Sequence, residues 1–374
     1  MQQYKTWVEV KKKALAHNIA TIIALVNQKT AFFAVVKSNA YGHGLLTISK
    51  ELQAFGKQVK GFCVDSVLEG LKLRQNGLKK PILVLGPTLT SELRKGAQKE
   101  GITVTVSTME GLHNILKSKD KPAFHIKLDT GMHRQGFHYN DLPKLIQTIK
   151  KKNAQSLVTG LYTHFASAKD ITYPTYTHQQ AALFKKAIDR FKRAGFKNTI
   201  THASATGGTL LFSKYHFDAV RIGIGMYGLW PSKELQIQRP EIKLQPVLSW
   251  HALVSEVKKL KKGDYIGYDL TERLVKPATV AIIPIGYWHG FPRALSNTGY
   301  VLIKGKRAKV LGRVSMDLIV VNVSAIPCRV GDRATLIGKQ GSEEITAEEF
   351  SQRAGTSNYE VVTRINPLIE RIII

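Results

Sequence analysis

Residues 31–44 read Ala-Phe-Phe-Ala-Val-Val-Lys-Ser-Asn-Ala-Tyr-Gly-His-Gly. The first six form a short apolar run typical of a buried strand, and the small polar residues after them indicate a turn. Lys37 stands where the run ends. An amine beside Phe32, Phe33 and Val36 is partly removed from water, which weakens its ammonium form and allows it to attack an aldehyde. The stretch therefore predicts a strand with a reactive lysine at its carboxyl end.

Seven further apolar runs follow within the first 230 residues, separated by segments of helical period such as Ser91 to Lys99. The eight runs are Ala31 to Val36, Gly61 to Asp65, Pro81 to Leu85, Ile102 to Ser107, Ala123 to Leu128, Leu157 to Thr163, Thr199 to Ala203 and Ala219 to Ile224. Eight successive βα units predict a closed parallel (β/α)8 barrel of the TIM type, with the helices outside.

From about Val247 the hydrophobic period changes to alternation, which predicts a mostly antiparallel β domain. Its runs are Leu248 to Val257, Ala278 to Ile285, Tyr300 to Ile303, Ala308 to Val310, Leu318 to Val323 and Arg333 to Ile337. A helix is expected over Ala347 to Ala354, with Thr346 as its N-cap and Glu349 three residues on.

The 374 residues are too many for one core, so we expect an α/β protein with a barrel domain at 1–240 and a β domain at 241–374, joined by a linker over 231–246. The two cysteines suggest neither a disulfide framework nor a metal site, and no apolar stretch is long enough to span a membrane. A cytoplasmic protein is expected. The formal charge of +28 is read as a solvated basic surface, because the lysines are scattered and no nucleic-acid-binding motif accompanies them.

Several chemically versatile residues stand at the carboxyl ends of the predicted barrel strands, the rim where active sites of such barrels lie. They are Lys37, Arg134, His164, Thr206, and Arg221 with Gly223. Each alone is weak evidence for a site. Their convergence on one rim predicts an active site there.

The ordered motifs of the whole chain resemble those of bacterial alanine racemases. The motifs are Val35-Val-Lys-Ser-Asn-Ala-Tyr-Gly-His-Gly44, Lys127-Leu-Asp-Thr-Gly-Met-His-Arg134, Thr163-His-Phe-Ala166, Arg221-Ile-Gly-Ile-Gly-Met-Tyr-Gly228, Gly267-Tyr268, Pro284-Ile-Gly-Tyr287, Gly312-Arg-Val-Ser-Met-Asp317 and Asn358-Tyr-Glu-Val361. The resemblance implies pyridoxal 5'-phosphate (PLP) as cofactor, carried by Lys37 as a Schiff base. It also implies which groups bind the cofactor. The phosphate is bound by Tyr41, Tyr359, Thr206 and the backbone amides near Gly223 and Ile224. His164 lies against the pyridine ring, and Arg221 faces the ring nitrogen.

The arginine has a direct chemical consequence. A guanidinium is only a donor, so the ring nitrogen it faces must stay unprotonated in order to accept. The ring is then a weaker electron sink, which favours quick reprotonation at the substrate α-carbon over transamination or decarboxylation.

Racemisation needs one acid/base on each face of the substrate. The resemblance assigns Lys37 to one face and Tyr268, from the partner subunit of a homodimer, to the other, where a nearby cation must favour the phenolate. Arg134, Met316 and Asp317 are expected to engage the substrate. Supporting roles fall to Lys127, at the position of a carbamylated lysine that braces the arginine in relatives, and to His202 and Tyr287.

Two segments depart from the family pattern. Where relatives usually carry Asn-Ser after the seventh strand, this chain has Ala205-Thr206, and alignment on Arg221 makes Thr206 the phosphate-binding hydroxyl. Where relatives usually carry Ala-Asp, it has Trp288-His289. The added bulk and the lost negative charge suggest altered substrate access or preference.

The sequence thus predicts an alanine racemase that interconverts L-alanine and D-alanine for peptidoglycan. The alternative is a same-fold racemase with another or broader substrate, such as serine or lysine, since one methylene or hydroxyl changes binding by only ~1–3 kcal/mol. A same-fold decarboxylase is disfavoured by Arg221. A non-catalytic PLP-binding or polyanion-binding protein, suggested by the charge, is disfavoured by Tyr268, Met316 and Asp317.

Overall fold

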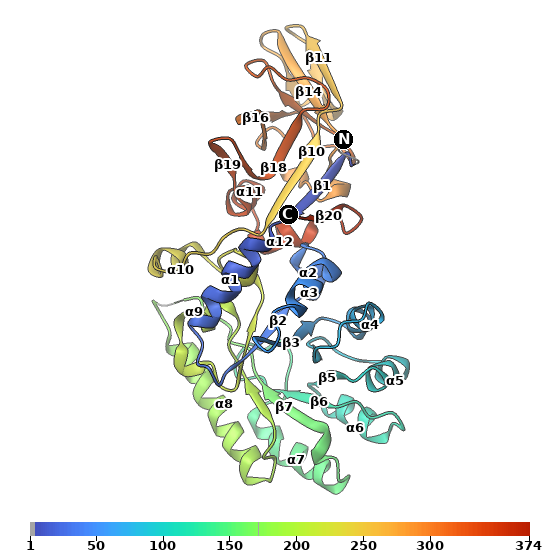
Figure 1. Cartoon of the computed structure of the whole chain (residues 1–374), viewed down its shortest axis with the longest axis vertical. Helices are drawn as coiled ribbons and strands as arrows, with labels where there is room; N and C mark the ends of the chain where they lie inside the picture. The colour runs from blue at the N-terminus through green and yellow to red at the C-terminus, as the bar shows by residue number, and fades with distance from the viewer. Residues whose placement is uncertain (1–3, 171) are drawn as a thin grey trace. The chain divides into compact units, whose positions relative to one another are not determined.

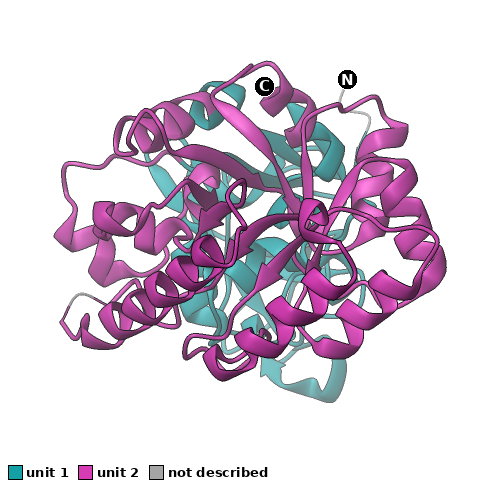
Figure 2. Cartoon of the chain, turned by 90° about the horizontal axis from the view of Figure 1, so that it is seen from below, with its two compact units in different colours: residues 1–15, 39–47, 246–374 teal, residues 16–38, 48–245 magenta. Residues whose placement is uncertain are grey.

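The computed structural model describes residues 4–170 and 172–374. The chain forms two compact units (Figure 2). The barrel unit comprises Ala16–Ser38 and Ile48–Gln245, and the β unit takes in the residues up to Leu15, Asn39–Thr47 and Pro246–Ile374.

In the barrel unit, eight parallel strands close in chain order, and the last pairs with the first (Figure 1). The strands are β2 (Ala31–Val35), β3 (Val59–Val64), β4 (Ile82–Val84), β5 (Ile102–Val106), β6 (Phe124–Lys127), β7 (Val158–Tyr162), β8 (Ile200–His202) and β9 (Ala219–Ile222). The helices that accompany them are α4 (Val67–Gln75), α5 (Ser91–Lys99), α6 (Met109–Lys117), α7 (Leu142–Lys151), α8 (Thr175–Arg193), α9 (Thr206–Leu211) and α10 (Lys233–Gln238). The predicted parallel barrel is confirmed. The predicted linker over 231–246, however, contains α10, and its residues up to Gln245 belong to the barrel unit.

Four of these helices begin with the same hydrogen bond. The side-chain oxygens of Ser66, Thr90, Thr108 and Ser232 each accept a hydrogen bond from the backbone N–H three residues on, at 3.2, 3.3, 3.0 and 3.3 Å. Such caps satisfy an N–H that has no partner within the helix and fix where the helix begins.

The β unit is built on a ten-stranded, mostly antiparallel sheet, as predicted, with a separate two-stranded ribbon of β12 (Tyr265–Ile266) and β13 (Glu272–Arg273). The sheet consists of β1 (Thr6–Val10), β10 (Leu248–Leu253), β11 (Glu256–Leu260), β14 (Ala278–Ile283), β15 (Tyr300–Ile303), β16 (Lys306–Leu311), β17 (Ile319–Asn322), β18 (Arg333–Gln340), β19 (Glu343–Ile345) and β20 (Glu370–Ile373). The predicted single run over 248–257 is two strands, β10 and β11, with a break at residues 254 and 255. Helix α11 (Ala347–Ala354) matches its prediction, and Thr346 Oγ1 accepts from the Glu349 N–H at 3.0 Å.

The division of the chain differs from the expected 1–240 and 241–374. Strand β1 pairs antiparallel with β10 and parallel with β20, and Trp7 and Val8 are fully buried. Residues 39–47 also group with the β unit. Both assignments come from contacts between residues more than 200 positions apart, which local sequence patterns do not carry.

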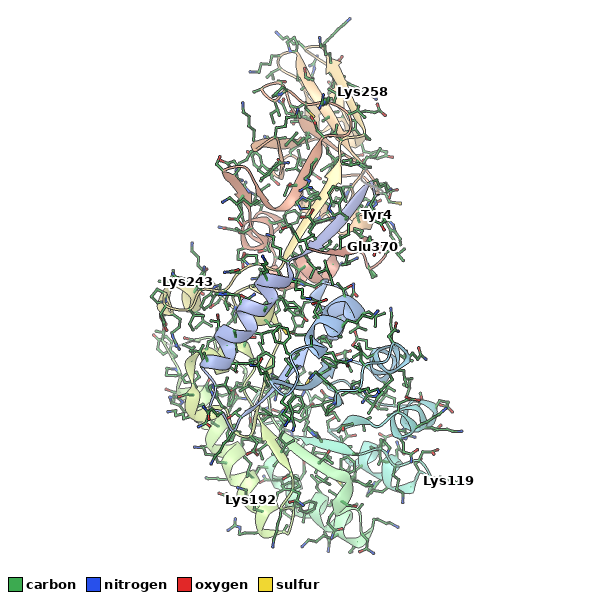
Figure 3. The ribbon with its side chains drawn as sticks, in the orientation of Figure 1. Tyr4, Lys119, Lys192, Lys243, Lys258 and Glu370 are labelled. Carbon is green, nitrogen blue, oxygen red and sulfur yellow. The ribbon has the colours of Figure 1, made fainter. Side chains whose placement is uncertain are left out.

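The remaining helices are α1 (Lys12–Ala24), α2 (Lys37–Tyr41), α3 (Leu45–Gln53) and α12 (Asn358–Arg364). In the described part of the chain, no helix combines the length and apolar character needed to cross a bilayer. Four exposed lysines labelled in Figure 3 come from well-separated segments: Lys119, Lys192, Lys243 and Lys258. Their spread agrees with a scattered basic surface.

Candidate active site

The barrel brings most of the predicted residues to the carboxyl ends of its strands. Lys37 follows β2, Lys127 ends β6, His164 follows β7, Thr206 opens the helix after β8, and Arg221 lies in β9. This confirms the strand ends on which the sequence placed them.

Lys37 lies on a half-exposed turn. Its side chain is 36% exposed, and its Nζ is 3.7 Å from Asp65 Oδ1. The backbone from Ser38 to Tyr41 has φ between +52° and +56°, so α2 is a left-handed turn. The Ser38 N–H donates to Glu69 Oε1 at 2.7 Å, and the Asp65 N–H donates to the other Glu69 oxygen at 2.7 Å. Glu69 thereby ties together the segments that carry the amine and its carboxylate partner.

Arg221 is a buried cation held by neutral groups. Its Nη2 donates to the carbonyls of Thr163 and Ala203 at 2.9 and 2.8 Å and contacts His164 Nδ1 at 3.1 Å, while Nη1 contacts His202 Nδ1 at 2.6 Å. Burial lowers the pKa of Arg221 below its ordinary value of 12.5, because the rings and carbonyls that contact it carry no formal negative charge to stabilise the cation.

The arginine sets the tautomers of three histidines. Because a guanidinium only donates, Nδ1 of both His164 and His202 must accept, which puts the proton of each ring on Nε2. His202 Nε2 then donates to His125 Nδ1, 2.9 Å away. Burial, reinforced by the Arg221 charge, holds the pKa of His164 and His202 well below 6.5 and lowers that of His125 to about 3. All three rings are therefore neutral at physiological pH.

Tyr162 completes the packing around this cluster. Its ring stacks on His202 with centroids 4.7 Å apart and an interplanar angle of 8°, and the Arg221 guanidinium lies 5.2 Å from its centroid. Thr105 Oγ1 donates to the Val84 carbonyl at 2.7 Å, so it accepts from the Tyr162 hydroxyl at 2.9 Å. Burial raises the pKa of Tyr162 to about 12, which keeps it a donor.

Lys127 is the second lysine at the rim, and it is 6% exposed. Its Nζ donates to Gln135 Oε1 at 2.9 Å. Burial, followed by the charges of Arg134, Arg221 and Lys37, lowers the pKa of Lys127 to about 8. Arg134 itself is exposed. A substantial fraction of the Lys127 amine is thus neutral and nucleophilic at mildly alkaline pH.

The two hydroxyls after β8 have different partners. Ser204 Oγ donates to the Tyr215 carbonyl at 2.8 Å, deep in the barrel, whereas Thr206 Oγ1 accepts from the Gly225 N–H at 3.3 Å. Thr206 is thereby tied to the turn that carries Gly223 and Ile224. Among the described residues no acceptor takes the hydrogen of the Thr206 hydroxyl, so Thr206 fits the expected phosphate-binding hydroxyl better than Ser204 does.

In the β unit, Tyr41 and Tyr359 lie together, with ring centroids 6.2 Å apart. Burial, followed by the proximity of Tyr41, raises the pKa of Tyr359 well above its ordinary value, so its hydroxyl stays protonated. Two tyrosines whose rings lie close together offer hydroxyl groups suited to a phosphate.

Tyr268 lies in a separate cavity of the β unit, of about 450 Å³. The cavity is lined by Tyr268, Asp269, Tyr287, Arg293, Arg313, Val314, Ser315 and Met316. Tyr268 is 68% exposed. Asp269 Oδ2 pairs with Arg313 at 3.2 Å and with Arg293 at 4.0 Å. Two arginines therefore line the same cavity as Tyr268, and a cation that favours its phenolate stays a prediction.

Trp288 and His289 line a different cavity, together with Tyr4, Lys5, Thr6 and Asn366. Trp288 is 57% exposed, whereas His289 is buried and its Nδ1 accepts from the Gly286 N–H at 3.2 Å. His289 Nδ1 also lies 3.8 Å from Asp317 Oδ1. Trp288 and His289, which depart from the family pattern, therefore adjoin the predicted substrate-binding segment but do not line the Tyr268 cavity. Altered substrate access stays a prediction.

Comparison with known proteins covers both units. A model of the alanine racemase N-terminal domain matches residues 10–231, and one of the alanine racemase C-terminal domain matches residues 247–373. The chain belongs to the alanine racemase family. It is therefore an enzyme of the isomerase class, as the sequence predicted.

Individual alanine racemases are similar over their full length. Alanine racemase from Leptospira interrogans (serovar copenhageni) is 35% identical, covering 99% of this chain and 96% of its own, and that from Methanococcus maripaludis is 38% identical, covering 100% and 99%. The crystal structure of the Bacillus anthracis alanine racemase with bound L-Ala-P has a TM-score of 0.90 at 34% identity, covering 100% of this chain and 96% of that one. The Streptomyces lavendulae enzyme has a TM-score of 0.92 at 29% identity, covering 100% and 98%.

Several residues of the candidate active site were not predicted from the sequence. They are Asp65, Glu69, Thr105, His125, Gln135, Tyr162, Asp269, Arg293 and Arg313. Several of them act on a predicted residue from another strand or loop, where no local motif marks them. Others stand close to a predicted residue in the chain: Asp269 follows Tyr268, Gln135 follows Arg134, and Arg313 lies within the quoted motif of residues 312–317. His125 stands two positions before Lys127 on the same strand, and in a strand alternate residues share a face.

Proposed function

We propose that the protein is an alanine racemase that interconverts L-alanine and D-alanine with PLP as cofactor. The observation that carries the proposal is Arg221. Nη1 has two hydrogens and, among the described residues, donates only one bond, to His202, so a donor remains for the ring nitrogen of PLP. A carboxylate at that position would instead favour a protonated ring.

The other groups fit the same cofactor. Lys37 would hold it through its amine, Tyr41, Tyr359 and Thr206 would donate to the phosphate with the amides near Gly223 and Ile224, and the neutral His164 would lie against the ring. When bound, PLP supplies the electron sink that makes the substrate α-proton removable.

The chain's own residues would move the proton. We propose that Lys37 and Tyr268 act on opposite faces of the substrate, and that Arg134, Met316 and Asp317 hold it. Tyr268 would be contributed by the second subunit of a homodimer, which would make dimerisation a requirement for activity. We further propose that Lys127 is carbamylated and braces Arg134, since a carbamate anion would be favoured near the positive charges of Arg134 and Arg221.

We propose a cytoplasmic role in supplying D-alanine for peptidoglycan. A racemase of serine or lysine is the second candidate, because Trp288 and His289 adjoin the substrate-binding segment. Neither membrane nor specific nucleic-acid binding is part of the proposal.

Incubation of PLP-loaded protein with L-alanine in heavy water tests the proposal. D-alanine formation together with deuterium at the α-carbon, both lost in Lys37→Ala, is the expected result. Absence of exchange and of D-alanine would refute the alanine assignment, and a panel with serine and lysine would then decide between the second candidate and a non-racemase.

A further inference from the structure

Two segments of the β unit, distant in sequence, carry Tyr41 and Tyr359. Tyr41 belongs to residues 39–47, and Tyr359 lies in α12. The segments meet at their backbones, because a Cβ atom built on Gly42 would lie 1.8 Å from the Val362 carbonyl oxygen. The separation of the two tyrosines therefore depends on what holds these backbones together.

Arg371, in β20, makes that connection. Its Nε donates to the Gly42 carbonyl at 3.1 Å. Its Nη2 donates to the Ile365 carbonyl at 3.1 Å, and its Nη1 donates to the carbonyls of Asn366 at 2.7 Å and of Ile369. Ile365 and Asn366 follow directly on the last turn of α12. One guanidinium thus binds the residue after Tyr41 and the end of the helix that carries Tyr359.

The connection requires an arginine in particular. The side chain is buried, at 9% exposure, and its hydrogen-bond partners are carbonyl oxygens. Burial lowers its pKa to about 10, which still leaves it charged at neutral pH. A guanidinium offers five N–H donors in a rigid plane, whereas a lysine offers three on one atom and cannot reach carbonyls on all sides.

We propose that Arg371 is a positioning residue for the cofactor phosphate, which sets the separation of the Tyr41 and Tyr359 hydroxyls. The inference rests on the proposed function, in which both tyrosines donate to that phosphate. Arg371 itself does not need to touch the cofactor.

The test compares PLP with pyridoxal, which lacks the phosphate. Full-length apoprotein is titrated with each, and Kd is measured by absorbance for the wild type, Arg371→Lys and Arg371→Met. We expect the variants to bind PLP about tenfold more weakly, equivalent to one lost hydrogen bond to a charged group, with an unchanged Kd for pyridoxal. Equal losses for both ligands, or an unchanged PLP affinity in a folded variant, would overturn the inference.

Arg74 provides a matched control. In the part of the chain that the structure describes, Arg74 also donates only to backbone carbonyls, those of Glu100, Leu78 and Lys80 at 3.0, 2.6 and 2.9 Å, and these lie within the barrel unit. Arg74→Met should lower the melting temperature without changing the ratio of PLP to pyridoxal affinity. A changed ratio in this variant would show that the ratio reports general destabilisation, which would remove the support for Arg371.

Two further measurements separate the possible failures. If Tyr41→Phe and Tyr359→Phe leave PLP affinity unchanged, the proposed phosphate assignment fails; if they weaken it and Arg371 variants do not, only the present inference fails. Should the Arg371 variants not fold, hydrogen–deuterium exchange of the wild type decides. PLP, but not pyridoxal, should then protect residues 39–47 and 358–366 together, and protection of one segment alone would contradict the inference.

Discussion

Lys127→Met should make the protein more stable at pH 7, by an amount that follows from where the amine lies. Burial and three neighbouring cations lower the Lys127 pKa from 10.5 to about 8. At about 1.4 kcal/mol per tenfold change in proton affinity, the charged amine costs the folded state about 3 kcal/mol. Losing the hydrogen bond to Gln135 offsets about 1 kcal/mol. The expected net gain in the free energy of unfolding is about 2 kcal/mol in buffer free of carbon dioxide.

The pH dependence has a definite sign. Between pH 8 and 10.5 the unfolded chain holds a proton on Lys127 that the folded chain has lost, so wild-type stability should rise with pH in this window. Lys127→Met lacks that contribution. Carbon dioxide adds to the neutral amine with release of a proton and gives a carbamate anion, which the neighbouring cations favour. In bicarbonate buffer the advantage of the methionine variant should therefore shrink or reverse.

Urea unfolding at pH 7, 8, 9 and 10, with and without bicarbonate, measures both effects. Lys72→Met, which removes an exposed lysine from α4, is the control for the change in net charge. The reasoning is refuted if Lys127→Met is less stable than the wild type at pH 7 without carbon dioxide, or if its stability rises between pH 8 and 10 as the wild type's does. Carbon-13 NMR with labelled bicarbonate would detect the carbamate directly.

Tyr268→Phe should lower the rate of racemisation by about 10²–10⁴-fold, because it removes the acid/base group on one face of the substrate. The rate of deuterium incorporation at the α-carbon, measured separately with L-alanine and with D-alanine, should then fall by different factors. An equal fall for both enantiomers would contradict the assignment of Tyr268 to one face. Thr206→Val should weaken PLP binding about tenfold through loss of a hydroxyl donor, whereas Thr206→Ser should bind normally, as titration of the apoprotein would show. Trp288→Ala should change kcat/KM for serine relative to alanine by about tenfold, since the bulk of one side chain near the substrate segment is worth about 1–3 kcal/mol; an unchanged ratio would place Trp288 outside the access route.

The sequence was informative where local pattern determines structure. Each barrel strand was found to within about two residues, because a short apolar run between turn residues identifies a buried strand. Arg221 and Thr206 could be assigned to the site because the carboxyl ends of barrel strands converge on one rim. The Thr346 cap was equally predictable, since its hydrogen bond closes within three residues.

The sequence did not predict contacts between residues that are far apart in the chain. Arg221 contacts His202 and lies near the Tyr162 ring because the three residues stand on neighbouring strands of the closed barrel. No shared sequence motif marks these three residues as neighbours. Strand β1 illustrates the same limit, because its alternation is compatible with several sheets and only its pairing with β10 and β20 assigns it to the β unit.

The turn after Lys37 shows why functional geometry resists local prediction. Four consecutive non-glycine residues from Ser38 to Tyr41 adopt left-handed φ, at a cost of about 1–2 kcal/mol each, and only Asn39 is of a type that tolerates it well. The turn persists because its surroundings hold it: Glu69 accepts from the Ser38 N–H, Asn39 Oδ1 accepts from the Leu45 N–H at 2.9 Å, and Arg371 holds the Gly42 carbonyl. Strain at a functional site is retained when the surrounding structure over-determines it. The backbone of this turn is thus held by the side chains of Glu69 and Arg371, which are distant in the sequence, together with Asn39 within the turn.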